Sequence, residues 1–562
     1  MSHHHHDGHE HHHHEVEPVE GSWQDPADDR PIAVARRRFL AGLGVAVGGA
    51  ALASTGAGTA AATPRPTNRW GAPQRWYAGD HHIHTQYSGD GQYTVSQQVA
   101  EARKHGLDWM VITDHGGVAH QKLSIDQVAP DIEKARRSNR DILVYQGLEW
   151  NIPGAEHATV FLPPGRGTVD ILRAFEAGYD GGILSTSVAN GGRGLITRST
   201  SADGEPYALA ALRYLEAQVL SGRTEIALMF ANHPSRRGVD SPHELRGWRD
   251  AAPGVAVGME GAPGHQAAGI SKASGGRGGA RGYYDSSPGV DSHPGYAPTA
   301  TENPYRTYGG FDWMTAKVGG LWDSMLAEGR PWWITSTSDV HQVFNDTLTP
   351  GPQDHDKTGS RGAPVDSGVK QSGFGDFFPG FYSQTVVGSR SRSYADVMRG
   401  LQAGRVIAVH GRLIDGLDLR VRALGEGDEQ GVTLGGRTFV KRGGSVEVTI
   451  EVTGAGGPNF AGAVPKLAKL DLVAGPVTGP VSDRDALSAP GTTVVKSFEV
   501  SKNRSRFTHV FRDVPGSFYL RVRGSDGKRL TADGGPVMDV VGDAEPWNDL
   551  WFYANPVFVD VV

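Results

Sequence analysis

The 562-residue chain contains no cysteine, and this absence excludes several kinds of site at once. Without thiols there can be no disulfide framework, thiolate zinc site, iron–sulfur cluster or cysteine nucleophile. Any metal site must therefore be built from histidine, aspartate and glutamate. The chain has 24 histidines to supply one.

The chain also has no net positive charge and few long apolar runs. The net charge is −7, which argues against a nucleic-acid scaffold bound through bulk charge. The apolar stretch at residues 39–53 is diluted by glycine, whereas a membrane span needs about 20 strongly apolar residues. The composition, 38% apolar and 21% charged, is globular. The 78 glycines predict many tight turns and long loops.

Residues 1–62 have the pattern of an export address. Arg36 and Arg37 precede the apolar stretch 39–53, and small residues ending in Ala60-Ala61-Ala62 follow it. This order resembles a cleaved twin-arginine signal. It predicts delivery by the twin-arginine export machinery to the periplasm, the cell surface or the medium, with no membrane anchor after cleavage. Upstream, nine of the first fourteen residues are histidine, which is typical of a purification tag or of a loose metal-binding tract.

After a linker at residues 63–75, short apolar runs alternate with stretches of helical spacing. The runs are 109–113, 142–145, 158–162, 226–230, 255–259 and 332–335, and the helical stretches include 95–105, 125–137, 207–220 and 311–328. The alternation predicts an α/β domain at 76–411 with a parallel sheet or barrel. In such folds functional residues gather at the carboxyl ends of the strands. Two glycine-rich segments, about 261–304 and 345–378, are predicted to be long loops.

The pattern changes after Gly411. Residues 417–422, 445–452 and 517–523 alternate apolar and polar side chains and are separated by glycine-rich turns. This predicts an antiparallel β-sandwich domain at 412–562.

Residues with metal-ligand chemistry stand beside nearly every buried run. They are His82, His84, Asp90, His115, Glu149, His157, His233, Asp339 and His341. Residues i and i+2 of a strand point the same way, so His82 and His84 can share one metal, and so can Asp339 and His341. Imidazole and carboxylate together suit Zn, Mn or Fe. A single histidine near a strand end is more often structural, but the repetition along the chain favours a site.

These residues resemble, in their order, the PHP (polymerase and histidinol phosphatase) superfamily of metal-dependent phosphoesterases. The matching motifs are His82-x-His84, Asp114-His115, Gly147-x-Glu149, the isolated His157 and His233, and the closing Asp339-x-His341. The sequence departs from the family in Ser88-Gly89-Asp90-Gly91, where a glycine is inserted between the serine and the aspartate.

The resemblance implies a distorted (β/α)₇ barrel with two or three divalent ions, which could be Zn, Mn or Fe. His82, His84, Glu149 and Asp339 would hold the first ion. Asp90, His115 and His341 would hold the second, and Glu149, His157 and His233 the third. Glu149, Asp339 and His341 are the predicted catalytic residues. A metal lowers the pKa of bound water to about 7, which supplies the hydroxide for hydrolysis.

Other residues near these motifs are candidates for supporting roles. Asp114 is predicted to orient a ligand histidine, and His81 to be structural. The candidates for binding the phosphate ester or donating a proton are Arg193, Arg236, Arg237 and His265, and Glu260 is a candidate for orienting the substrate or the ligands.

The leading hypothesis is an exported metal-dependent phosphoesterase acting on phosphomonoesters or phosphodiesters. One alternative is a carboxyl-ester or carbamate hydrolase with the same metals, because the C-terminal domain resembles the tail of a secreted PHP branch with such activities. The other is a non-enzymatic metal-binding surface protein. For the β domain itself, a stabilising or surface-binding role is expected.

Overall fold

The buried apolar runs form consecutive strands of one sheet in a computed structural model, which describes residues 75–117, 123–197, 201–425, 427 and 430–562. The strands are β1 (Arg75–Asp80), β2 (Trp109–Ile112), β3 (Leu143–Asn151), β4 (His157–Leu162), β5 (Leu228–Ala231), β6 (Ala256–Ala262) and β7 (Trp333–Ser336). Their order in the sheet follows the chain. All residues of β2, β5 and β7 are buried, as expected for strands covered on both faces.

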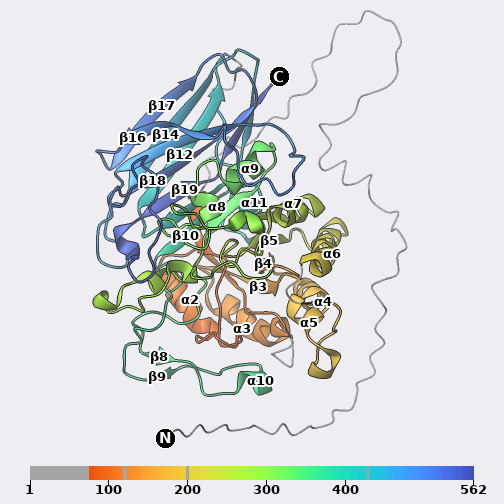
Figure 1. Cartoon of the computed structure of the whole chain (residues 1–562). Helices are drawn as coiled ribbons and strands as arrows, with labels where there is room; N and C mark the ends of the chain where they lie inside the picture. The colour runs from red at the N-terminus through yellow and green to blue at the C-terminus, as the bar shows by residue number, and fades with distance from the viewer. Residues whose placement is uncertain (1–74, 118–122, 198–200, 426, 428–429) are drawn as a thin grey trace, which may run out of the picture. The chain divides into compact units, whose positions relative to one another are not determined.

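Helices follow most of these strands, and Figure 1 shows α3, α4, α6 and α7 around β3 to β5. The helices are α2 (Val95–Lys104), α3 (Ser124–Ser138), α4 (Thr168–Tyr179), α5 (Gly181–Ser185), α6 (Ser201–Leu220), α7 (Pro242–Ala251), α8 (Trp313–Ala316) and α9 (Leu321–Ala327). Capping boxes at Thr94 and Ser241 start α2 and α7. The helix predicted at 311–328 is two short helices, because Gly319, with φ of +76°, and Gly320 separate them.

One strand breaks the parallel order. β1, β2 and β3 are parallel, and so are β5, β6 and β7, but β4 runs antiparallel to both of its neighbours. The sheet is therefore not parallel throughout. Because β4 is reversed, its first residue, His157, pairs with Asn151 at the end of β3. The start of β4 thus lies at the same edge as the carboxyl ends of the other strands.

The first and last of these strands approach each other just beyond their carboxyl ends. Ile83 forms a parallel bridge with Val340, and the His84 N–H donates to the Val340 carbonyl at 3.2 Å. β10 (Ser383–Ser389) pairs with β1 on its other side, and the Ser336 N–H donates to Thr385 Oγ1 of β10 at 2.9 Å. The segments after β1 and β7 are therefore held side by side.

The C-terminal region is rich in antiparallel strands, which Figure 1 shows in blue at the upper left. It contains α11 (Tyr394–Gln402), β11 (Val406–His410), β12 (Ile414–Ala423), β13 (Arg437–Val440), β14 (Val446–Gly454), β15 (Lys469–Pro476), β16 (Thr493–Glu499), β17 (Arg504–Phe511), β18 (Phe518–Ser525), β19 (Trp551–Ala554) and β20 (Val557–Val561). β12, β14 and β17 form a sheet of their own, whereas β11 joins β10 to β19 in the first sheet.

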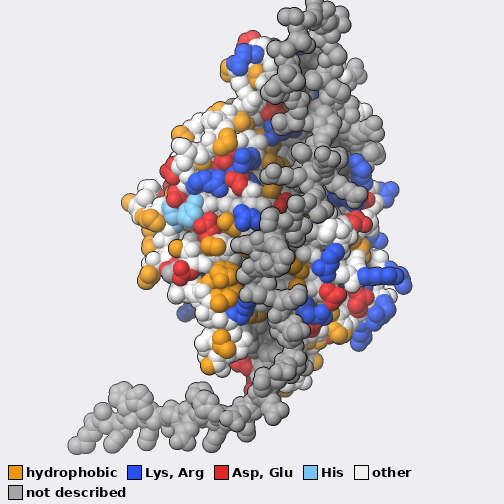
Figure 2. Space-filling model, turned by 90° about the vertical axis from the view of Figure 1, so that its right-hand side faces the viewer, with side chains coloured by type: hydrophobic (Ala, Val, Ile, Leu, Met, Phe, Trp, Pro, Cys, Tyr) orange, Lys and Arg blue, Asp and Glu red, His pale blue; other side chains and the backbone are white. Residues whose placement is uncertain are grey.

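The described residues belong to one compact unit, and sheet hydrogen bonds continue past residue 411. The domain boundary at 411 stays a prediction. The leader and twin-arginine segment, residues 1–62, lie outside the described residues, as does the predicted linker up to residue 74. None of the described helices combines the length and apolarity that crossing a bilayer requires. On the face shown in Figure 2, basic and acidic side chains are interspersed.

Both segments predicted as loops carry little regular structure. The first contains short 3₁₀ turns at Gln266–Gly269, Lys272–Ser274, Arg281–Tyr283 and Pro294–Tyr296. Its residues Ala267, Ala268, Tyr284 and Tyr296 are nevertheless fully buried, so much of this loop packs like core. The second contains the short strands β8 (Leu348–Thr349) and β9 (Val365–Asp366) and the helix α10 (His355–Thr358).

Candidate metal centre

Strand ends meet around a cavity of about 350 Å³. Of the ligands predicted from sequence, those that line it are Asp90, His115, Glu149, His157, His233, Asp339 and His341. His82 and His84 are fully buried and contact the lining carboxylates. The structure therefore brings all nine predicted ligands together.

The first group consists of His82, His84, Glu149 and Asp339. His82 Nε2 lies 3.0 Å from Glu149 Oε1 and 3.1 Å from Asp339 Oδ1. His84 Nε2 lies 3.3 Å from Glu149 Oε2 and 3.3 Å from Asp339 Oδ1. The two Nε2 atoms are 3.0 Å apart. The ligand atoms of these four residues thus lie close together, and they are the four that the family resemblance implies for the first metal.

The partners of the opposite ring nitrogens fix the protonation of this group. His82 Nδ1 donates to Glu260 Oε1 at 2.7 Å, because a carboxylate only accepts. His84 Nδ1 donates to Ser88 Oγ at 2.8 Å, because the Ser88 hydroxyl itself donates to Asp114. In neutral rings both Nε2 atoms then carry lone pairs, which face each other and two carboxylates. Only a cation between them, or extra protons on the rings, can relieve this repulsion.

The second group lies nearer the solvent. His115 Nδ1 is 2.7 Å from Glu149 Oε2, and His115 Nε2 is 3.4 Å from Asp90 Oδ2. His341 Nε2 is 3.4 Å from both Asp90 Oδ1 and His115 Nε2. Asp90 reaches the site despite the inserted glycine. A tight turn brings Gly91 back against Thr85, and a Cβ added to Gly91 would lie 2.0 Å from the Thr85 carbonyl oxygen. Its side chain is 60% exposed, so the cavity opens here.

The third group is centred on the other side of Glu149. His157 Nδ1 lies 3.1 Å and His233 Nε2 3.4 Å from Glu149 Oε1. Glu156 approaches from behind, with Oε2 3.9 Å from His157 Nδ1 and 3.8 Å from His233 Nδ1. Glu149 contacts all three groups and is the carboxylate that could bridge metals.

The pKa values of the site residues reflect these contacts. Burial raises the pKa of Glu149, but His82, His157 and His115 outweigh it and hold the pKa well below its ordinary value. Burial also opposes ionisation of Asp339, yet His265 and His82 lower its pKa well below normal. Burial lowers the pKa of His82, and the carboxylates of Asp339 and Glu149 raise it well above normal. A proton on His82 thus compensates for the facing carboxylates where a metal ion would otherwise do so.

The backbone places several of these residues in strained conformations. His233, His265 and Asp339 have φ values of 33°, 53° and 45°, in the left-handed region that non-glycine residues rarely adopt. Gly264 makes room for the last of them, because an added Cβ would lie 2.2 Å from Asp339 Cβ. Strain held by surrounding structure is typical of functional sites.

The residues present fit divalent metal ions. The groups offer imidazole nitrogens and carboxylate oxygens, the ligands that Zn, Mn and Fe accept. Asp339 Oδ1, Glu149 Oε2 and both ring nitrogens of His233 are buried and make no hydrogen bond of good geometry. Buried polar atoms without such partners are costly unless another ligand, such as a metal, satisfies them.

The predicted substrate-binding residues lie in different places, and only two of them line the cavity. Arg236 and His265 line the cavity. Glu260 is fully buried behind the first group, where it accepts from His82 and from the His233 N–H (2.8 Å), so it orients ligands and does not reach the cavity. Arg237 is 62% exposed and pairs with Glu156 at 3.2 Å. Arg193 is exposed and donates to the Gly178 carbonyl, outside the site.

The two predicted supporting residues behave differently. Asp114 accepts from Thr85 and from Ser88, and so orients His84 through the serine. His81 is buried, stacks on Phe230 and contacts Thr335 Oγ1 at 2.8 Å. These contacts fit a structural role.

Sequence reasoning missed Glu156, Asp376, Tyr283 and Asn232. Asp376 lies 2.5 Å from His265 Nδ1 and accepts from the His341 N–H. The Tyr283 ring lies 4.3 Å from the His265 ring on the cavity wall. Asn232 donates to Glu149 Oε1 at 3.0 Å. Only Glu156, next to His157, and Asn232, next to His233, carried a signal in their adjacency to predicted ligands.

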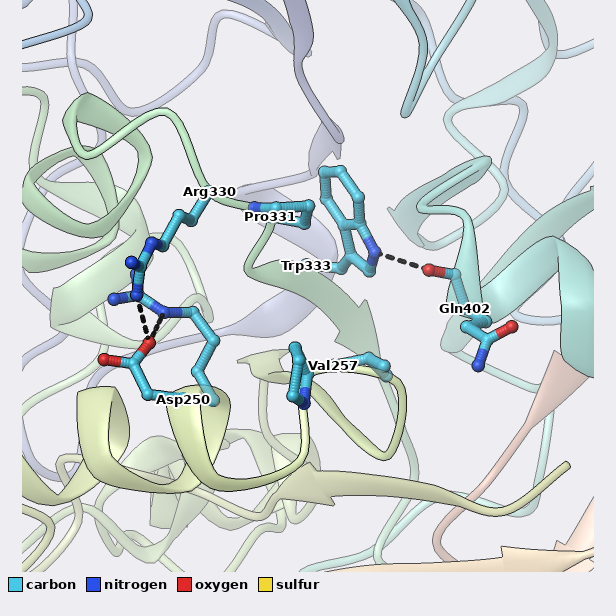
Figure 3. A pocket seen from close by; sticks show the side chains of 8 residues that line it. Asp250, Val257, Arg330, Pro331, Trp333 and Gln402 are labelled. Carbon is cyan, nitrogen blue, oxygen red and sulfur yellow. Dashed lines mark hydrogen bonds and ion pairs between the residues drawn. The ribbon is translucent and has the colours of Figure 1, made fainter. Parts of the chain in front are cut away.

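A second cavity and a second histidine cluster lie away from the metal centre. A cavity of about 420 Å³ lies at the opposite end of β6 and β7, where Arg330 pairs with Asp250 and the Trp333 indole donates to the Gln402 carbonyl (Figure 3). Its neighbouring Arg249 is also paired, with Glu328. Elsewhere, His243 and His293 both contact Asp485, but His293 Nδ1 accepts from the Gly295 N–H, which leaves a proton on Nε2 for Asp485. Hydrogen bonds explain that cluster without a metal.

Comparison with known proteins agrees with the motifs. The crystal structure of a two-domain protein containing a predicted PHP-like metal-dependent phosphoesterase from Bacteroides vulgatus matches at 16% identity, covering 83% of this chain and 94% of that one, with a TM-score of 0.30. No curated protein sequence matched. The PHP domain profile matches residues 80–222, which include His82, His84, His115, Glu149 and His157. The chain therefore contains a PHP domain at residues 80–222.

Proposed function

We propose that the protein is a metal-dependent phosphoesterase that hydrolyses phosphomonoesters or phosphodiesters with two or three divalent ions, of Zn, Mn or Fe. The observation that carries this proposal is the arrangement of His82 and His84, whose Nε2 atoms face each other and the carboxylates of Glu149 and Asp339. The PHP domain at residues 80–222 supports the same reaction class.

The residues of the site would hold the metal ions, orient their ligands or contact the substrate, according to where each lies. Divalent ions bound there would polarise a phosphoryl oxygen and acidify a water molecule. Glu149 holds the three ligand groups together, and Glu260 and Ser88 keep His82 and His84 in the tautomers that leave Nε2 free of a proton. Arg236 lines the cavity, where its guanidinium would contact phosphoryl oxygens.

For the architecture, we propose the distorted (β/α)₇ barrel followed by a β-sandwich. The bridge between Ile83 and Val340, which joins the segments after β1 and β7, supports a closed barrel. An apolar cluster that includes Leu419 and Ile450 of one sheet and Leu472 and Val522 of the other supports a sandwich.

A second candidate is hydrolysis of carboxyl esters or carbamates. The observation in its favour is that Arg236, the arginine lining the cavity, faces Glu156 at 3.5 Å and so is partly neutralised. A neutral substrate needs no cationic contact, and the Tyr283 ring on the wall could pack against an apolar group.

We also propose that the chain is exported by the twin-arginine machinery and acts outside the cytoplasmic membrane. The support is the sequence alone, Arg36 and Arg37 before an apolar stretch and the Ala60-Ala61-Ala62 cleavage pattern. Replacing both arginines with lysine should retain the protein in the cytoplasm, as fractionation would show. Continued export would overturn this proposal.

One set of assays tests the two activities. The purified protein is stripped of metal and reconstituted separately with Zn, Mn or Fe(II), then given p-nitrophenyl phosphate, bis-p-nitrophenyl phosphate, p-nitrophenyl acetate and an aryl carbamate. Metal-dependent release from a phosphate supports the phosphoesterase and distinguishes monoester from diester. Turnover of only the acetate or the carbamate would contradict it and favour the second candidate.

A further inference from the structure

One wall of the metal cavity is formed by the loop after β6. His265 and Tyr283 belong to the segment after β6, whose only regular structure is short 3₁₀ turns. His265 Nε2 lies 2.8 Å from Asp339 Oδ2, and the Gly282 N–H donates to the His265 carbonyl, which ties the chain beside Tyr283 to His265. Ordering such a loop costs about 1–2 kcal/mol of backbone entropy per residue, which other contacts must offset.

Asp339, Asp376 and the Ser338 carbonyl contact His265 directly, and the loop has further partners in the C-terminal region. Residues 536–546, which we call the template segment, lie between β18 and β19 and run along the loop. The Gly542 and Ala544 N–H groups donate to the carbonyls of Gly279 and Gly269, at 2.8 and 3.0 Å. The Asp539 N–H donates to the Thr307 carbonyl at 2.8 Å. The loop thus has backbone partners on a strand connection far along the chain.

The Asp539 side chain adds hydrogen bonds and an ion pair to the backbone contacts between the template segment and the loop. Its Oδ2 accepts from Thr307 Oγ1 at 2.9 Å and from the Gly310 N–H at 2.8 Å. Its Oδ1 faces the Arg281 guanidinium at 3.5 Å. Asp539 and Arg281 are both buried, so each needs the other's charge.

Arg281 carries the contact from the template segment to the cavity. It donates from Nε to Gln266 Oε1 at 2.7 Å and from Nη2 to the Tyr382 hydroxyl at 2.5 Å. Gln266 directly follows His265, and Arg281 lies two residues before Tyr283. Arg281 is thus linked to the chain directly beside both cavity residues.

We propose that the template segment is a positioning element of the active site, with Asp539 and Arg281 as the positioning residues that hold His265 and Tyr283 in the cavity. The C-terminal region then does more than stabilise the chain, because it sets the shape of one cavity wall. The activity readout of this inference rests on the proposed function, and its structural readout does not.

The test compares three variants of the full-length protein. Asp539→Asn removes the charge that faces Arg281, and Thr307→Val removes one hydrogen bond to Asp539. The matched control is Asp471→Asn, because Asp471 is also buried in the C-terminal region, pairs with Arg523 at 3.1 Å and accepts from the Ser497 hydroxyl at 2.7 Å, but does not contact the loop. The measurements are kcat, KM, metal content and backbone hydrogen exchange.

We expect Asp539→Asn to lower kcat/KM by about 10- to 100-fold, since small misplacements of site residues cost this much. Exchange in residues 264–284 should accelerate by at least about 10-fold, with metal content unchanged. Thr307→Val should shift both quantities less, in the same direction, and the control should shift neither. Equal effects in Asp539→Asn and Asp471→Asn, or unchanged exchange in 264–284, would overturn the inference. If the wild type turns over no ester, the proposed function fails and the exchange comparison decides the inference alone.

Discussion

The Nε2 atoms of His82 and His84 lie 3.0 Å apart, although each ring already donates a proton from its Nδ1 atom. Two neutral rings held this way repel each other. Glu260 and Ser88 enforce the arrangement from behind, and Glu149 and Asp339 complete it in front. The fold therefore assembles electron-rich groups around a point that a cation would occupy.

Glu149 is the residue on which the three ligand groups depend. Replacing it with glutamine keeps its volume but removes the charge that faces His82, His115 and His157. We expect kcat to fall by about 10³-fold or more, because a catalytic metal contributes several kcal/mol. Metal content measured by mass spectrometry should fall with it. Glu133→Gln, at a carboxylate that is 54% exposed, is the control and should leave both unchanged. Normal turnover in Glu149→Gln would contradict the site.

Glu260 acts on the metal only through His82 and His233. In Glu260→Gln, the amide could donate to His82 Nδ1 and so move the ring proton to Nε2, the wrong tautomer for a ligand. We expect metal affinity to fall by about 10- to 100-fold, as is usual for groups that orient ligands. Titration of the metal-free protein measures this. Excess metal should restore most of the activity, and a variant that excess metal leaves inactive would indicate a direct role in the reaction instead.

Arg236 and Arg193 form a matched pair, because only the first lines the cavity. Losing a charge-assisted hydrogen bond costs about 1.5–3 kcal/mol, so Arg236→Gln should raise KM for a phosphate ester by roughly 10-fold or more. Turnover of p-nitrophenyl acetate should change little. Arg193→Gln should behave as the wild type with both substrates. An equal loss for phosphate and acetate in Arg236→Gln would indicate damage to the site rather than a lost phosphate contact.

The ligand residues could be found from sequence because strand ends are recognisable. An apolar run followed by a polar residue identified His115 and His233 without any structure. His157 precedes its run, and sequence alone could not explain how it joins residues that follow theirs. The reversed direction of β4 explains this, since it brings the start of β4 to the carboxyl edge of the sheet.

The groups that sequence reasoning missed or misassigned act through tertiary contacts. Asp376 meets His265 across 111 residues of chain, and no local pattern marks Asp376 as its partner. Glu260 was expected to orient either substrate or ligands, and only its tertiary contacts, to His82 Nδ1 and the His233 N–H, distinguish the two by placing it behind the ligands. Arg193 was a candidate for binding phosphate because of its residue type, but its loop lies outside the metal centre. Side-chain direction and loop course, rather than element type, limited the prediction.

The charge balance of the centre predicts how metal stabilisation depends on pH. In the metal-free protein, burial lowers the pKa of His82 and of His115, and the facing carboxylates outweigh it and raise both well above the ordinary value. Protonated rings therefore stabilise the metal-free fold fully below the unfolded histidine pKa of about 6.5. That contribution is lost as the pH rises through the raised values.

Metal binding needs the same nitrogens without protons, so bound metal should stabilise the fold more at high pH than at low pH. We expect the difference in melting temperature between protein with Zn or Mn and protein with chelator to be larger at pH 8.5 than at pH 6. Glu149→Gln, which lacks the central carboxylate, should show a small difference at both values. A wild-type difference that is equal at the two pH values, or larger at pH 6, would show that these histidines do not exchange protons for metal. The fold would then hold them for another purpose.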